Sequence, residues 1–122
     1  MRRRTRAFTL IEIIIVVQIV AILLMMAVPT FIRSRTASRL QAVIGNLVAI
    51  DKAKHICAME KGAANGDTTT CTQAVIVHST NGWIKKWPTG PVSGTYVVGA
   101  IGTRPTFKGK DEVQWRTDFS GL

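Results

Sequence analysis

The pattern of apolar and polar residues changes twice along this chain. From residue 8 to residue 28 almost every side chain is apolar, and the exceptions are Thr9, Glu12 and Gln18. A run of this length is about long enough to cross a bilayer as one helix. After Pro29 the apolar residues recur at helical spacing instead, and beyond Gly62 the pattern breaks into short strand-like and turn-like pieces.

Residues 30–61 are predicted to be the amphipathic half of the same helix. Pro29 removes a backbone hydrogen bond and predicts a kink, while Gly62 predicts the helix end. At 1.5 Å per residue the helix would be about 80 Å long, so its two halves need different partners. We expect the apolar stripe to be Leu40, Val43, Ile44, Leu47, Ile50 and Cys57, with Ala37 and Ala53 on or near it, opposite Arg39, Gln41, Asn46, Lys52 and Glu60.

Residues 62–122 are predicted to form a small domain of loops and short strands. The clearest strand lies between Gly94 and Gly99, and weaker candidates are 105–108 and 113–117. Together they predict an antiparallel β-meander of about three strands, with one face on the helix stripe. The expected fold class is therefore α+β: a long N-terminal helix, half transmembrane and half amphipathic, packed on a small sheet.

Charge at the start of the chain narrows the interpretation of the apolar run. Arginines at positions 2, 3, 4 and 6 precede it, and Glu12 lies inside it. A secretory signal peptide would have a shorter apolar stretch and a small-residue cleavage site at its far end. A plain signal anchor explains the arginines but not a carboxylate in lipid, which is costly and needs a reason.

The residues around Glu12 resemble the N-terminus of type IV prepilins and the pseudopilins of type II secretion systems. The hallmark of that family is a short basic leader and a small residue, followed by Phe-Thr-Leu-Ile-Glu and a long apolar helix. This chain has Phe8-Thr9-Leu10-Ile11-Glu12 after a leader of residues 1–7, and Pro29 stands where the family usually has a proline. The resemblance is strong to about residue 60 and weak beyond it.

This resemblance implies a processing site and a fate for the helix. A prepilin peptidase would cut between Ala7 and Phe8 on the cytoplasmic side, and the new Phe8 amine would be N-methylated. The family usually has glycine before the cut, whereas Ala7 is the next smallest residue, and Ala21 stands where many relatives have a glycine. The implied domains are a leader (1–7), a transmembrane or filament-core helix (8–29), its amphipathic half (30–61) and a globular domain (62–122).

Glu12 has a physical role in this scheme. After cleavage, the carboxylate of one subunit can neutralise the terminal ammonium of a neighbour inside an apolar filament core. Either charge alone in that core costs several kcal/mol, so assembly is favoured over leaving Glu12 bare. The alternative is a Glu12 side chain that reaches the headgroups beside the arginines.

Composition agrees with one small exported subunit. The chain has 122 residues and a formal charge of +9. Without the four leader arginines, twelve basic and seven acidic residues remain, a charge of +5 before the termini are counted. Much of the basicity is therefore a topology signal and not a nucleic-acid footprint.

The two cysteines, Cys57 and Cys71, are candidates for a disulfide. An exported domain meets an oxidising environment, and a bridge would add roughly 2–4 kcal/mol to a thin core. The alternative is a pair of buried free thiols.

Residues 81–88 contain two tryptophans around two lysines. Trp83, Lys85, Lys86 and Trp87 could stack bases and hold phosphates, as single-strand binders do. The alternative, which we favour, is that the tryptophans plug a gap in a chain short of core while the lysines are solvated.

Candidates for catalysis or metal binding are few. His55 and His78 have no companions at triad or ligand spacing, and Asp111, Glu112 and Asp118 could gather around calcium but more often form a solvated turn. We expect no enzymatic activity, no cofactor and no metal.

The favoured interpretation is a structural subunit of a type IV pilus or a secretion pseudopilus, anchored in the bacterial inner membrane. Its N-terminus would be cytoplasmic and its C-terminal domain periplasmic, before incorporation into a periplasmic or cell-surface filament. The expected partners are the peptidase, membrane lipid, identical and related pilin subunits, and an assembly platform with its ATPase; nucleic acid is disfavoured. Alternatives are an anchored DNA- or ligand-binding module that uses Trp83 to Trp87, and an anchored enzyme.

Overall fold

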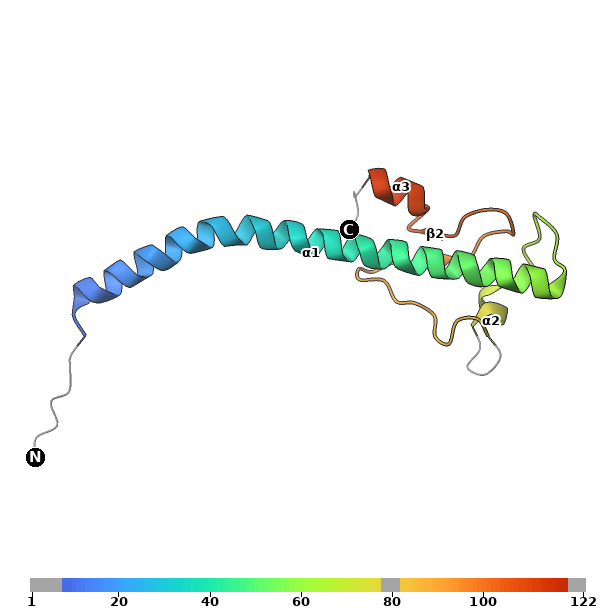
Figure 1. Ribbon diagram of the computed structural model, residues 1–122, viewed down its shortest axis with the longest axis horizontal. Coiled ribbons are helices and arrows are strands. Elements are labelled where there is room, and N and C mark those ends of the chain that lie inside the picture. Colours follow the sequence, from blue (N-terminus) through green and yellow to red (C-terminus); the bar gives the residue numbers. More distant parts are fainter. Residues whose placement is uncertain (1–7, 78–81, 119–122) are drawn as a thin grey trace, which may run out of the picture. The chain divides into compact units, whose positions relative to one another are not determined.

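The computed structural model describes residues 8–77 and 82–118. Its elements are helix α1 (Leu10–Lys61), helix α2 (Gln73–Ile76), strand β1 (Tyr96–Val97), strand β2 (Thr106–Phe107) and helix α3 (Glu112–Thr117) (Figure 1). A long apolar helix followed by a small antiparallel sheet is the α+β fold that the sequence predicts. The chain divides into two compact units, Met1–Arg35 and Thr36–Leu122.

The first unit is helical from Leu10 onward, and its side chains have no core to pack against. Every described residue up to Arg35 is exposed. The helix begins two residues later than predicted because Thr9 occupies the capping position. It continues through Pro29, where the Thr30 Oγ1 hydroxyl donates to the Met26 carbonyl oxygen at 3.2 Å. The kink at Pro29 remains a prediction.

Helix α1 ends at Lys61, as predicted from Gly62. Gly62 has a φ of +61°, in the left-handed region that a glycine adopts without a steric penalty. The next residue, Ala63, donates its N–H to the Ala58 carbonyl at 3.0 Å. A left-handed glycine followed by a hydrogen bond back to the last helical turn is the usual way in which an α-helix ends.

The core of the second unit is built on the predicted stripe of α1. Three positions differ from the expectation: Ala37 is exposed, and Arg39 and Asn46, both placed on the polar face, are half-buried. Asn46 turns inward because its Nδ2 donates to the hydroxyl of buried Tyr96 at 2.9 Å. The buried α1 residues of the core are Val43, Ile44, Leu47, Ile50, Ala53 and Cys57, with Leu40 packed at the edge.

The sheet in the described residues has two strands, not the predicted three. β1 and β2 are antiparallel, with Tyr96 opposite Phe107 and Val97 opposite Thr106. The ring centroids of Tyr96 and Phe107 are 4.5 Å apart, and those of Phe107 and Trp115 are 6.1 Å apart. Aromatic packing therefore links the sheet to the segment that follows it.

That following segment, residues 113–117, was predicted as a strand and is helix α3. The Asp111 side chain accepts from the Gln114 backbone N–H at 2.8 Å, and the Gln114 side chain accepts from the Asp111 N–H at 2.9 Å. This capping box starts a helix and satisfies two of its free backbone donors. The helical turn then buries Trp115, whose Nε1 donates to the Phe107 carbonyl at 3.1 Å. In Figure 1, α2 and α3 lie on opposite sides of the second half of α1.

Candidate functional site

The Phe8–Glu12 segment forms the start of helix α1. The Glu12 backbone N–H donates to the Thr9 carbonyl at 3.1 Å and lies 3.4 Å from the Thr9 hydroxyl oxygen. Thr9 therefore caps the helix, and Glu12 stands three residues later, the spacing of a capping box. We did not predict this cap, although Thr-x-x-Glu before an apolar run is its sequence signal.

Glu12 and Phe8 are both accessible to another molecule. Phe8 is 73% exposed, and Glu12 lies in a first turn where the helix dipole favours a negative charge. A partner that brings a cation to the N-terminal end of α1 would meet the Glu12 carboxylate on a helical turn that is already formed. Ala7 and the leader lie outside the described residues, so the structure gives no geometry for the Ala7–Phe8 bond.

The rest of this half of α1 presents apolar side chains all round. Among the described residues, one helix is long and apolar enough to cross a membrane, and it is α1. Uniform exposure of large aliphatic side chains is characteristic of helices that lipid or other helices cover. The exposed apolar residues between Leu10 and Ile32 include Ile14, Ile19, Leu23, Met26 and Phe31.

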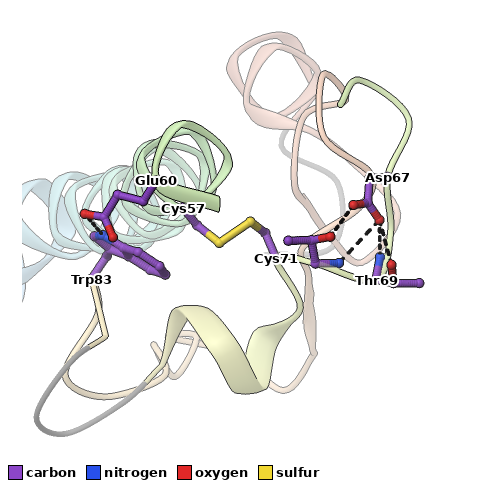
Figure 2. The surroundings of a disulfide bond; sticks show 7 residues. Cys57, Glu60, Asp67, Thr69, Cys71 and Trp83 are labelled. Atoms are coloured by element: carbon purple, nitrogen blue, oxygen red, sulfur yellow. Dashed lines mark hydrogen bonds between the residues drawn. A yellow bond between two sulfur atoms is a disulfide. The ribbon is translucent and has the colours of Figure 1, made fainter. Parts of the chain in front are cut away.

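A disulfide joins Cys57 on α1 to Cys71, just before α2 (Figure 2). The Cα atoms are 6.0 Å apart, and the two cysteines are 14 positions apart in the sequence. The bridge fastens the loop after α1 back onto the last turns of the helix. Both cysteines are part of the buried core.

Inside that loop, Asp67 organises the residues that lead to Cys71 (Figure 2). Its carboxylate accepts from the Thr69 N–H at 2.7 Å and from the Thr69 hydroxyl at 2.8 Å, and also from the Thr70 hydroxyl. These donors hold the pKa of Asp67 well below its usual range, with the Thr70 hydroxyl contributing most. A single charged side chain therefore holds the turn before the disulfide.

The tryptophan–lysine segment separates into packed rings and solvated charges. Trp83 and Trp87 are half-buried and pack against the core, while Lys85 and Lys86 are exposed. The Trp83 Nε1 lies 3.4 Å from a Glu60 carboxylate oxygen (Figure 2). This arrangement fits the packing role for the tryptophans, and Asn81 lies outside the described residues.

The three acidic residues considered for calcium are each engaged in local structure. Asp111 caps α3 and lies 3.8 Å from Arg104, Glu112 pairs with Arg116 at 2.6 Å, and Asp118 pairs with Lys110 at 2.5 Å. Within residues 8–77 and 82–118, no group of three His, Cys, Asp or Glu side chains is placed to hold a metal ion. His55 is 52% exposed beside Asp51, and His78 lies outside the described residues.

Two buried polar groups on or facing α1 were missed by pattern analysis. Lys54 is fully buried within the stripe, and burial lowers its pKa while the Asp51 carboxylate opposes that shift. Burial also raises the pKa of Tyr96, against the hydrogen bond that Asn46 donates to it. A lysine among apolar residues at helical spacing was the available signal for the first, because its position on the stripe requires burial.

Comparison with known proteins adds evidence at the N-terminus. Residues 2–28 match the family model described as the prokaryotic N-terminal methylation motif. No curated protein and no solved structure matches the chain. The match covers the basic start, the Phe8–Glu12 segment and the apolar run up to Pro29. The chain therefore carries the N-terminal methylation signature of type IV prepilins and pseudopilins.

Proposed function

We propose that this chain is a structural subunit of a type IV pilus or a type II secretion pseudopilus. The observation that carries the proposal is the methylation motif at residues 2–28, whose apolar part is a helix with side chains exposed on every side. The motif supplies a processing signal, and the exposed helix supplies a surface that needs lipid before processing and sister subunits afterward. The role is structural and not catalytic.

The proposed pathway begins in the bacterial inner membrane, with the N-terminus cytoplasmic and the C-terminal domain periplasmic. A prepilin peptidase cuts between Ala7 and Phe8, and the Phe8 amine is N-methylated. An assembly platform with its ATPase then moves the subunit from lipid into a periplasmic or cell-surface filament, where identical and related subunits surround residues 8–29.

Glu12 is proposed to make this transfer selective. A neighbour's terminal ammonium neutralises the carboxylate in an environment where either charge alone costs several kcal/mol. The Thr9 cap supports this role, because it fixes the first turn from which Glu12 projects.

The first experiment is intact mass spectrometry of the protein purified from cells that contain the peptidase. The proposal expects a mature chain that begins at N-methyl-Phe8. A chain that keeps Met1 to Ala7 in those cells would contradict the proposal, and cells without the peptidase serve as the control for the unprocessed mass.

The second experiment compares Glu12→Ala with Gln18→Ala, a matched polar-to-alanine change in the same apolar run. Glu12→Ala should abolish sheared filament while the anchored subunit and its disulfide persist, and Gln18→Ala should still assemble. Equal filament yield from both variants would exclude the proposed role of Glu12.

A further inference from the structure

The fully buried Lys54 ammonium lies among backbone carbonyl oxygens of one loop. Its Nζ donates to the Val98 oxygen at 3.2 Å, to the Ala100 oxygen at 3.1 Å and to the Thr103 oxygen. An ammonium has three N–H donors, so the three carbonyls use its full capacity. The lysine side chain is 0% exposed. Lys54 is therefore a completely coordinated internal cation.

The loop that supplies these oxygens, residues 98–103, is bent around the ammonium. Gly99 and Gly102, which separate the three residues that supply the oxygens, have φ angles of +71° and +87°, in the left-handed region that glycine adopts without a steric penalty. Between them, Ile101 is buried in the core and exchanges backbone hydrogen bonds with Gly66 and Asp67, at 2.9 and 3.0 Å. The loop thus faces both the ammonium and the segment that leads to the disulfide.

Converging carbonyl oxygens are the ligand set of a cation site. Backbone carbonyls hold cations in proteins by replacing the water of the first hydration shell. Without a cation, the buried Val98 carbonyl would lose the hydrogen bond that Nζ donates to it, and the converging carbonyl dipoles would repel one another. The Ala100 carbonyl also accepts from the Thr103 N–H at 3.1 Å and from the Thr103 hydroxyl at 2.7 Å. Among the described residues, the Asp51 carboxylate also lies near Nζ, 3.7 Å away, so the ammonium is shared by the three carbonyls and one anionic side chain.

We propose that loop 98–103 is a cation-binding site whose ligand is a primary ammonium, supplied by the chain itself as Lys54. The site stabilises the fold separately from the disulfide, because it holds the loop between β1 and β2 against α1. If the side chain is removed, the empty site should accept a primary ammonium ion from solution.

Chemical rescue of the full chain in detergent tests the proposal. Lys54→Ala removes the three methylenes and the ammonium beyond Cβ, which propylammonium replaces atom for atom. Lys54→Ala should unfold at a lower temperature than the wild type, and propylammonium chloride should raise its Tm by several degrees. Lys52→Ala, at an exposed lysine on the same helix, is the matched control and should show neither effect.

Two additives separate a cation site from simple filling of a void. Tetramethylammonium has the charge but no N–H donors, and 1-propanol has the chain without the charge. Rescue by either one equal to that by propylammonium, or an equal Tm rise in the wild type, would overturn the proposal. If Lys54→Ala does not fold alone, refolding yield replaces Tm: propylammonium should restore it, and failure to do so would count against the site.

Discussion

At the residue scale, the small core of the second unit depends on the close packing of a few side chains against glycines. Phe107 is fully buried between Tyr96 and Trp115, with ring centroids 4.5 and 6.1 Å away. Gly90 and Gly94 leave space for its ring, since a Cβ atom at either position would lie 2.9 or 2.7 Å from Cζ. A buried ring with aromatic neighbours cannot move to admit a methyl group.

Gly94→Ala should therefore destabilise the domain by about 1–3 kcal/mol, the usual cost of overpacking. Chemical denaturation of the detergent-solubilised chain measures this. Gly45→Ala is the matched control: an added Cβ at Gly45 meets nothing within 4 Å, and alanine in a helix is favoured over glycine by up to about 1 kcal/mol. Loss of stability in the control equal to that in Gly94→Ala would refute the overpacking explanation.

Asp67 should give the fold a measurable acid sensitivity. Its folded pKa lies below the usual value of 3.8, so the unfolded chain binds the proton more readily. The stability that this group contributes is present above pH 3.8 and is lost as pH falls toward the folded pKa. Asp67→Asn should be less stable than the wild type at pH 7 and should lose less additional stability on acidification. Tm measured from pH 7 downward tests this, and parallel curves would contradict it.

At the element scale, capping hydrogen bonds decide between helix and strand where the hydrophobic spacing of a short segment fits both. Residues 113–117 read as a strand by composition, yet Asp111 and Gln114 close a capping box and Trp115 turns into the core. The same signal begins α1, where Thr9 and Glu12 have the same spacing. The prediction of a strand failed because β-propensity over five residues is weaker than two specific hydrogen bonds and one buried indole.

Asp111→Ala should destabilise the domain by about 1 kcal/mol, since it leaves the Gln114 N–H without its side-chain acceptor. Asp111→Asn keeps an acceptor oxygen at the same place and serves as the control, with a smaller loss expected. Thermal unfolding distinguishes the two, and an equal loss would mean that the ion pair with Arg104 matters and the cap does not.

At the scale of the whole molecule, the two units have opposite requirements. The second unit buries its stripe of α1 under the sheet and α3, whereas the described part of the first unit leaves every side chain exposed. Such a chain is stable only where lipid or other helices cover residues 8–32. The same requirement is the physical reason why the proposed membrane anchor and the proposed filament core can be one segment.

In cells without the peptidase, the chain should stay in the membrane pellet after high-salt and alkaline washes and should dissolve only in detergent. The reason is burial of about 20 apolar residues in the bilayer. Fractionation and immunoblotting measure this. Glu12→Ala should fractionate in the same way, because the carboxylate is proposed to act in assembly and not in anchoring; release of either protein by salt alone would contradict the anchor.

The sequence alone determined the long helix, its buried stripe and its end, as well as the α+β class and the N-terminal signature. These follow from features that are local in the chain: a 21-residue run with few polar exceptions, helical spacing and a glycine stop. Tertiary structure decided which groups Lys54 and Asn46 meet and where Trp115 lies, because each depends on partners more than 40 residues away or on a cap that outweighs propensity. Long-range contacts of this kind leave no periodic trace in a single sequence, since nothing local requires a lysine to meet the carbonyls of a distant loop.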